Sequence, residues 1–213
     1  MKVIAINGGA RKGWNTHLLL QEALRGAEAN GAEGQMVNLF DLDFKGCIGC
    51  LGCKLKGGNV TKCALRDDLT PILESLETID GVIMGSPIYL NEVTGALRSF
   101  IERMVFPYIS YDEFGARLFK GQKKTAFVFT TNCPESKYDK VGYDKLFAGY
   151  EDLFARMFGQ CKTLAVGETL QTNDYDKYHM AIFDAPDRRR RREEVFPKEC
   201  EKAFELGQWL AQE

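Results

Sequence analysis

The sequence lacks the features that mark membrane, secreted or nucleic-acid-binding proteins. Its 213 residues contain no run of 18 apolar residues, so no membrane-spanning helix is expected. Met1 leads directly into an apolar run of strand type, which does not resemble a signal peptide. The formal net charge of −2 gives no support to nucleic-acid binding. These absences predict a cytoplasmic protein with no membrane or nucleic-acid partner.

Internal repeats and low-complexity segments are also absent, and the length suits one α/β domain over residues 1–213. Expected strands lie at 3–6, 35–40, 81–86, 124–131 and 162–166, and expected helices at 15–30, 71–79, 94–106, 143–158 and 193–211. This alternation predicts a doubly wound, five-stranded parallel sheet with helices on both faces. Ligands of such sheets bind at the carboxyl ends of the strands. The arginine run 188–192 is interpreted as a solvated connection before the last helix, with a contact to a cofactor phosphate or to a partner as the alternative.

A glycine-rich loop between the first expected strand and the first expected helix predicts an anion-binding site. Glycines allow close approach to the backbone, while free N–H groups and the dipole at a helix start favour negative charge. The loop matches neither the G-x-G-x-x-G fingerprint nor the Walker A pattern, because Trp14 stands at the Walker A lysine position. Arg11, Lys12, Asn15 and Thr16 would suit one terminal phosphate.

Two segments resemble the NADPH-dependent FMN reductase family, whose flavodoxin-like fold has strand order 2-1-3-4-5. Residues 8–16 resemble its G-S-P-R-K-x-x-N-T phosphate loop, with Gly9 and Ala10 in place of Ser and Pro. Residues 85–98 resemble its G-S-P-x-Y-x-x-x-x-x-G-x-L-K/R segment, which in that family lies against the isoalloxazine ring. With a third loop after residue 129, the resemblance implies FMN contacts from Gly8, Gly9, Arg11, Lys12, Asn15, Thr16, Ser86, Pro87, Ile88, Tyr89, Leu90, Asn91, Thr130, Thr131 and Asn132.

Four of the seven cysteines form a C-x2-C-x2-C-x9-C pattern, Cys47, Cys50, Cys53 and Cys63, in an insertion at about 45–66. Thiolates at successive steps of three can converge on one centre, as in bacterial ferredoxins, whereas zinc more often uses separated C-x-x-C pairs. The pattern resembles iron-sulfur flavoproteins, relatives of the FMN reductases in which a compact four-cysteine motif binds a [4Fe–4S] cluster. The final gap here is longer than in that motif. A cluster, zinc and free thiols all remain open.

The resemblance implies an FMN-dependent NAD(P)H oxidoreductase that passes electrons to an unidentified small-molecule or protein acceptor, with a [4Fe–4S] relay if the cluster exists. No catalytic residue is assigned, because the chemistry belongs to N5 of FMN. One alternative is an iron-sulfur flavoprotein that transfers electrons from a ferredoxin-like donor, and another is a cysteine-based redox sensor. The resemblance also implies a homodimer with flavin near the subunit interface, for which the aromatic segment 105–119 is the candidate contact.

Overall fold

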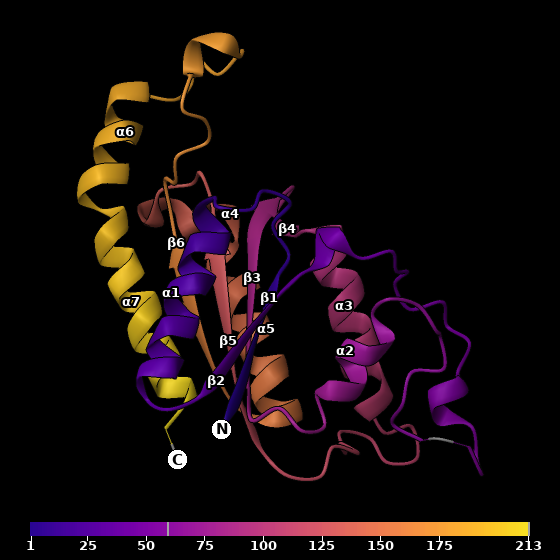
Figure 1. The fold of residues 1–213 in the computed structure, drawn as a ribbon. Coiled ribbons are helices and arrows are strands. Elements are labelled where there is room, and N and C mark those ends of the chain that lie inside the picture. Colours follow the sequence, from indigo (N-terminus) through magenta and orange to yellow (C-terminus); the bar gives the residue numbers. More distant parts are fainter. Residues whose placement is uncertain (59, 213) are drawn as a thin grey trace.

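Five long parallel strands form the centre of the computed structural model, which describes residues 1–58 and 60–212 (Figure 1). They are β1 (Lys2–Asn7), β2 (Glu33–Asn38), β3 (Gly81–Tyr89), β5 (Lys123–Thr130) and β6 (Gly159–Val166). The sheet order is β2-β1-β3-β5-β6, so the parallel strands, counted along the chain, follow the predicted order 2-1-3-4-5. Asn59, within the predicted insertion, and Glu213 lie outside the described residues.

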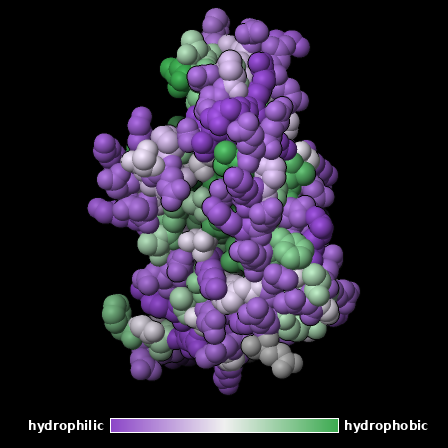
Figure 2. All heavy atoms as spheres, turned by 90° about the vertical axis from the view of Figure 1, so that its left-hand side faces the viewer, coloured by the Kyte–Doolittle hydropathy of each residue, from purple (hydrophilic) through white to green (hydrophobic). Residues whose placement is uncertain are grey.

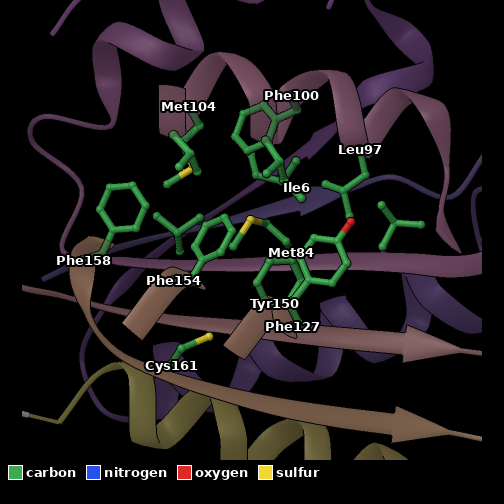
Figure 3. Packing of buried hydrophobic residues seen from close by; sticks show 14 of the residues in the cluster. Ile6, Met84, Leu97, Phe100, Met104, Phe127, Tyr150, Phe154, Phe158 and Cys161 are labelled. Atoms are coloured by element: carbon green, nitrogen blue, oxygen red, sulfur yellow. The ribbon is translucent and has the colours of Figure 1, made fainter. Parts of the chain in front are cut away.

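Apolar residues on alternate positions of the strands face two helical layers. One face is covered by α1 (Asn15–Ala29) and α7 (Phe196–Leu210), and the other by α3 (Gly95–Val105) and α5 (Tyr143–Phe158) (Figure 1). Figure 3 shows the second interface, where sheet residues Ile6, Met84 and Phe127 meet Leu97, Phe100 and Met104 of α3 and Tyr150, Phe154 and Phe158 of α5. The short helices α2 (Thr70–Ser75) and α4 (Tyr138–Val141) complete this side of the structure. The predicted two-faced sheet is confirmed.

The chain after the third predicted strand forms a hairpin, where the sequence suggested only an exit loop. β3 continues to Tyr89 and pairs antiparallel with β4 (Glu92–Val93). Leu90 and Asn91 form the turn with φ of 50° and 63°, the left-handed conformation that suits a two-residue hairpin. The Ser86 hydroxyl accepts the N–H of Thr94 at 2.9 Å and closes the hairpin. This contact between polar groups eight residues apart has no signature in the apolar pattern of the sequence.

The arginine run is helical, so its interpretation as a solvated connection was wrong. Helix α6 (Ala185–Glu194) contains the run, and its N-cap is Asp184, whose carboxylate accepts the N–H of Asp187 at 3.0 Å. Arg188 is buried and donates to the carbonyl of Asn132 at 3.2 Å. Figure 2 views the side of the molecule that carries α1, α6 and α7, and its surface is mostly hydrophilic. No helix among the described residues has the length and apolarity needed to cross a membrane.

The aromatic segment 105–119 lies between the end of α3 and the start of β5, at the amino end of the sheet (Figure 1). Tyr108 and Phe119 pack edge to face against each other and against Phe158, with ring centroids 5.1 to 6.0 Å apart. Tyr111 and Phe114 are exposed. The predicted flavin loops are at the opposite, carboxyl end of the strands, so segment 105–119 does not lie beside the flavin loops of its own chain, and its role as a subunit contact stays a prediction.

Candidate functional site

The three predicted loops meet in one cleft of about 250 Å³ at the carboxyl ends of β1, β3 and β5. Its lining comprises Gly9, Ala10, Arg11, Trp14, Asn15, Thr16, Pro87, Ile88, Tyr89, Thr130, Thr131, Asn132, Thr169 and Gln171. A larger hollow of about 500 Å³ runs beside β6, and Thr169 lines both spaces. The fold therefore brings together residues from each of the loops that the sequence singled out.

The start of α1 presents an uncompensated positive end to this cleft. Within the described residues, Trp14 at the N-cap makes no side-chain hydrogen bond to the first turn, and that turn contains no acidic residue. The N–H groups of the first turn are therefore available to an anion. Asn7 shapes the loop below them by accepting the N–H of Gly9 at 2.9 Å. A Cβ at Gly8 would lie 2.7 Å from Cβ of Leu97, so this position requires glycine.

Three polar side-chain groups complete the cleft. Thr16 Oγ1 and Thr130 Oγ1 are 2.8 Å apart, which joins the first and third loops. Asn132 Oδ1 is buried and has no hydrogen-bond partner among the described residues. Because a buried acceptor without a donor is costly, this oxygen suits a ligand N–H. The cleft thus offers donors to an anion and an acceptor to a polar ring, a combination that fits a flavin phosphate.

A fourth loop, which sequence reasoning missed, borders the cleft. It follows β6, and its backbone carbonyls hold the phosphate loop in place. Leu170 O accepts from Trp14 Nε1 at 3.1 Å and from Asn15 Nδ2 at 2.7 Å, and Gln171 O accepts from Arg11 Nη1 at 2.7 Å. The rule that parallel strands place their exit loops at one edge could have identified this loop, since β6 itself was predicted.

Some predicted residues do not line the cleft. Lys12 forms an exposed ion pair with Asp41 at 2.6 Å. Gly8 and Ser86 lie in the interior, where they support the loops. Leu90 and Asn91 are at the tip of the hairpin, and Leu90 is fully exposed. Contacts from these five positions to a flavin remain predictions.

The four cysteines share a second, much smaller hollow of about 20 Å³ beside the C-terminal half of α3. Cys47 and Cys50 are exposed, Cys53 is buried, and Cys63 is intermediate. Burial raises the pKa of the Cys53 thiol. Among residues 1–58 and 60–212, no three Cys, His, Asp or Glu side chains converge closely enough to hold a metal ion. The donor set suits a thiolate-bound centre, and its members would have to draw together around one.

Arg103 of α3 anchors the cysteine segment. Its fully buried side chain donates from Nη1 to Asp67 Oδ2 at 2.5 Å and to the carbonyl of Lys45 at 3.0 Å, and from Nη2 to Leu65 O at 3.0 Å. Burial alone would raise the pKa of Asp67, but the hydrogen bond and charge of Arg103, together with backbone N–H groups of Lys45 and Leu69, outweigh it and hold that pKa below its ordinary value. On the other side of the run, Lys54 Nζ donates to the carbonyls of Phe106 and Pro107, each at 2.8 Å.

Comparisons with known proteins agree with this geometry. Residues 1–133 match the model of a family described as NADPH-dependent FMN reductase. An iron-sulfur flavoprotein of Methanocaldococcus jannaschii is 40% identical over 103 residues, which cover 48% of this chain and 51% of that protein. An iron-sulfur flavoprotein of Archaeoglobus fulgidus is 36% identical over 103 residues, 48% of each chain. The chain therefore spans about half the length of these curated relatives.

Among solved structures, an NAD(P)H:quinone oxidoreductase from Methanothermobacter marburgensis superposes with a TM-score of 0.72. The alignment covers 98% of each chain at 13% sequence identity, which supports the fold alone. The family match covers more than half of the 213 residues and includes all three predicted flavin loops. The chain belongs to the NADPH-dependent FMN reductase family.

Proposed function

We propose that the chain is an FMN-dependent oxidoreductase that accepts electrons from NAD(P)H and passes them to a small-molecule or protein acceptor. The cleft at the carboxyl end of the sheet carries this proposal, because it combines free helix-start N–H groups with an unpartnered buried acceptor, Asn132 Oδ1. Residues 1–213 would act as one FMN-binding domain, to which the cysteine segment is an insertion.

Each part of the cleft has a separate task in this proposal. The first turn of α1, the Thr16 hydroxyl and the Arg11 guanidinium would hold the terminal phosphate. The backbone from Pro87 to Tyr89 would lie along the ring, and Asn132 would accept a ring N–H. FMN would supply the chemistry, since its N5 accepts hydride from a nicotinamide. No side chain is required to act as acid or base.

The cysteine segment would bind a [4Fe–4S] cluster that relays single electrons. The four thiols in one hollow support this proposal, as do relatives named iron-sulfur flavoproteins. The two sites lie toward opposite ends of α3. Thr94, at its N-cap, donates to Gly8 O at 2.7 Å, and Arg103 anchors the cysteine segment. At the α-helical rise, these two residues are separated by about 14 Å.

We also propose that the chain forms a homodimer or larger oligomer. The support is the exposed hairpin tip beside the cleft, where Leu90 is fully exposed and Tyr89 is half exposed. Leu90 and the adjacent Tyr89 expose two large apolar side chains at this tip, and contiguous exposed apolar surface marks interaction sites. Light scattering at micromolar concentration should give at least twice the chain mass, and a monomer would contradict this proposal.

The central experiment is an anaerobic titration of the cofactor-free protein with FMN, followed by mixing with NADH or NADPH. We expect tight binding of FMN, weaker binding of riboflavin, and rapid bleaching of the flavin spectrum by at least one nicotinamide. Absence of FMN binding would overturn the proposed function. Bleaching by a ferredoxin-like one-electron donor alone would favour the electron-transfer alternative.

Iron and zinc are assayed on the same sample, purified without oxygen. About four irons per chain and a broad absorbance that dithionite bleaches would support the cluster. One zinc per chain would indicate that the four cysteines hold a structural metal and that the proposed electron relay does not exist. If neither metal is present after anaerobic reconstitution, the cysteines would be left as free thiols, and the relay would be rejected.

A further inference from the structure

We infer that Arg192, on α6, is a positioning residue for the flavin phosphate and makes the cleft selective for FMN over riboflavin. The inference rests on the proposed function and adds a residue outside the part of the chain that matches the family model, residues 1–133. It starts from a single contact, in which Arg192 Nη1 donates to Asn15 Oδ1 at 3.0 Å.

Both polar atoms of the Asn15 side-chain amide already form hydrogen bonds within the protein. Its Nδ2 donates to the carbonyl of Leu170 at 2.7 Å, while its Oδ1 accepts from Arg192. Asn15 is buried, and it is the first residue of α1. Its side chain therefore ties the start of α1 to the loop after β6 and to α6. Only its backbone N–H is left for a phosphate.

Arg192 differs from the rest of the arginine run by being partly buried without an ion pair, since Arg189, which also forms no ion pair within the described residues, is exposed. Arg188 and Arg191 both pair with Glu168, at 3.4 and 3.0 Å. Arg190 pairs with Asp187 and Glu194 on the surface of α6. Arg192, in contrast, has no carboxylate within ion-pair distance in the part of the chain that the structure describes. Its guanidinium lies 4.0 Å from the ring centroid of Phe196, and burial lowers its pKa.

A half-buried cation without a carboxylate is unfavourable beside the start of a helix, because that end of the helix dipole is itself positive. Arg11 adds a second cation at the same place, with its guanidinium 4.7 Å from the Trp14 ring centroid and its Nη1 on a backbone carbonyl. The first turn of α1 supplies no acidic residue to offset them. An anion at this helix start would offset both cations, and the phosphomonoester of FMN provides such an anion, whereas riboflavin does not.

The test compares FMN and riboflavin affinity, measured by quenching of flavin fluorescence, in the wild type and three variants. Arg192→Gln should weaken FMN binding about tenfold and leave riboflavin binding within about twofold, as expected for the loss of one charge-assisted contact. Arg192→Lys, which keeps the positive charge, should show a preference for FMN over riboflavin between those of Arg192→Gln and the wild type. Arg190→Gln, on the same helix but paired at the surface, is the matched control and should bind both flavins like the wild type.

Two results would overturn the inference: equal losses for the two flavins in Arg192→Gln, which indicate a merely structural role, or no loss for either. If that variant does not fold, Asn15→Ala breaks the same link from the other side, and an unchanged ratio of affinities there overturns the inference. Failure of the proposed function looks different, because the wild type itself would then bind FMN no more tightly than riboflavin.

Discussion

Substitution of Gly207 by alanine should separate the two helices that cover one face of the sheet and destabilise the protein. Helices α1 and α7 approach so closely that a Cβ at Gly207 would lie 1.7 Å from the carbonyl oxygen of Ala23. Gly26 of α1 faces α7 equally closely, since a Cβ there would lie 1.9 Å from the carbonyl oxygen of Phe204. Both obstacles are backbone atoms, which no change of side-chain rotamer can relieve.

The magnitude follows from this geometry. To bring the new Cβ to 3.0 Å from the carbonyl oxygen, α7 must move by at least about 1.3 Å. Overpacking of this kind costs roughly 1–3 kcal/mol, and a rigid backbone obstacle should place it near the upper end. The better helix propensity of alanine returns about 0.5–1 kcal/mol. A net loss of about 2 kcal/mol should lower Tm by roughly 4–8 °C for a chain of this size.

The matched control is Gly149→Ala in α5, an exposed helix position where a Cβ would meet no atom of the described residues within 4 Å. The same substitution should there stabilise the protein by about 0.5–1 kcal/mol. Urea and thermal unfolding, followed by circular dichroism, would measure both variants. If Gly207→Ala matched or exceeded the stability of the wild type, the close approach of α1 and α7 would be refuted.

Three further predictions concern the site and the cysteines. Thr16→Val removes the hydroxyl that lies 2.8 Å from Thr130 Oγ1 and should weaken FMN binding about tenfold by calorimetry, whereas unchanged affinity would remove Thr16 from the phosphate site. Burial raises the pKa of Cys161 to about 11, so at pH 8 iodoacetamide should label exposed Cys47 in the metal-free protein far faster than Cys161, and similar rates by mass spectrometry would contradict this burial. The pKa of Asp67 is depressed in the folded state, so its stabilisation is present above the ordinary pKa of 3.8 and is lost as pH falls below it. The stability gap between wild type and Asp67→Asn should therefore narrow between pH 6 and pH 3 in urea titrations, and a constant gap would count against the ion pair.

The sequence by itself determined the layered fold and the position of the cleft. Alternating apolar runs and amphipathic segments can bury their apolar surfaces in few ways, and a parallel sheet with two helical layers is the one that they form. Because parallel strands end at one edge, the loops at Gly9, Pro87 and Thr130 had to meet there. The sequence also shows that position 8 is glycine, but only the structure explains why, because Leu97 approaches so closely that a Cβ would not fit.

Only the tertiary structure decided which distant residues support the cleft. The hydrogen bond from Asn15 to the carbonyl of Leu170 and the contact of Arg192 with Asn15 join positions far apart in the chain, and no local pattern encodes them. The arginine run shows what the sequence alone cannot predict. Five consecutive arginines suggest a solvated stretch, but the spacing of helix α6 turns Arg188 and Arg192 toward the protein. There Arg188 pairs with the carboxylate of Glu168, and Arg192 donates to the amide oxygen of Asn15. Local pattern sets which elements form, whereas the partners of a buried charge depend on how those elements pack.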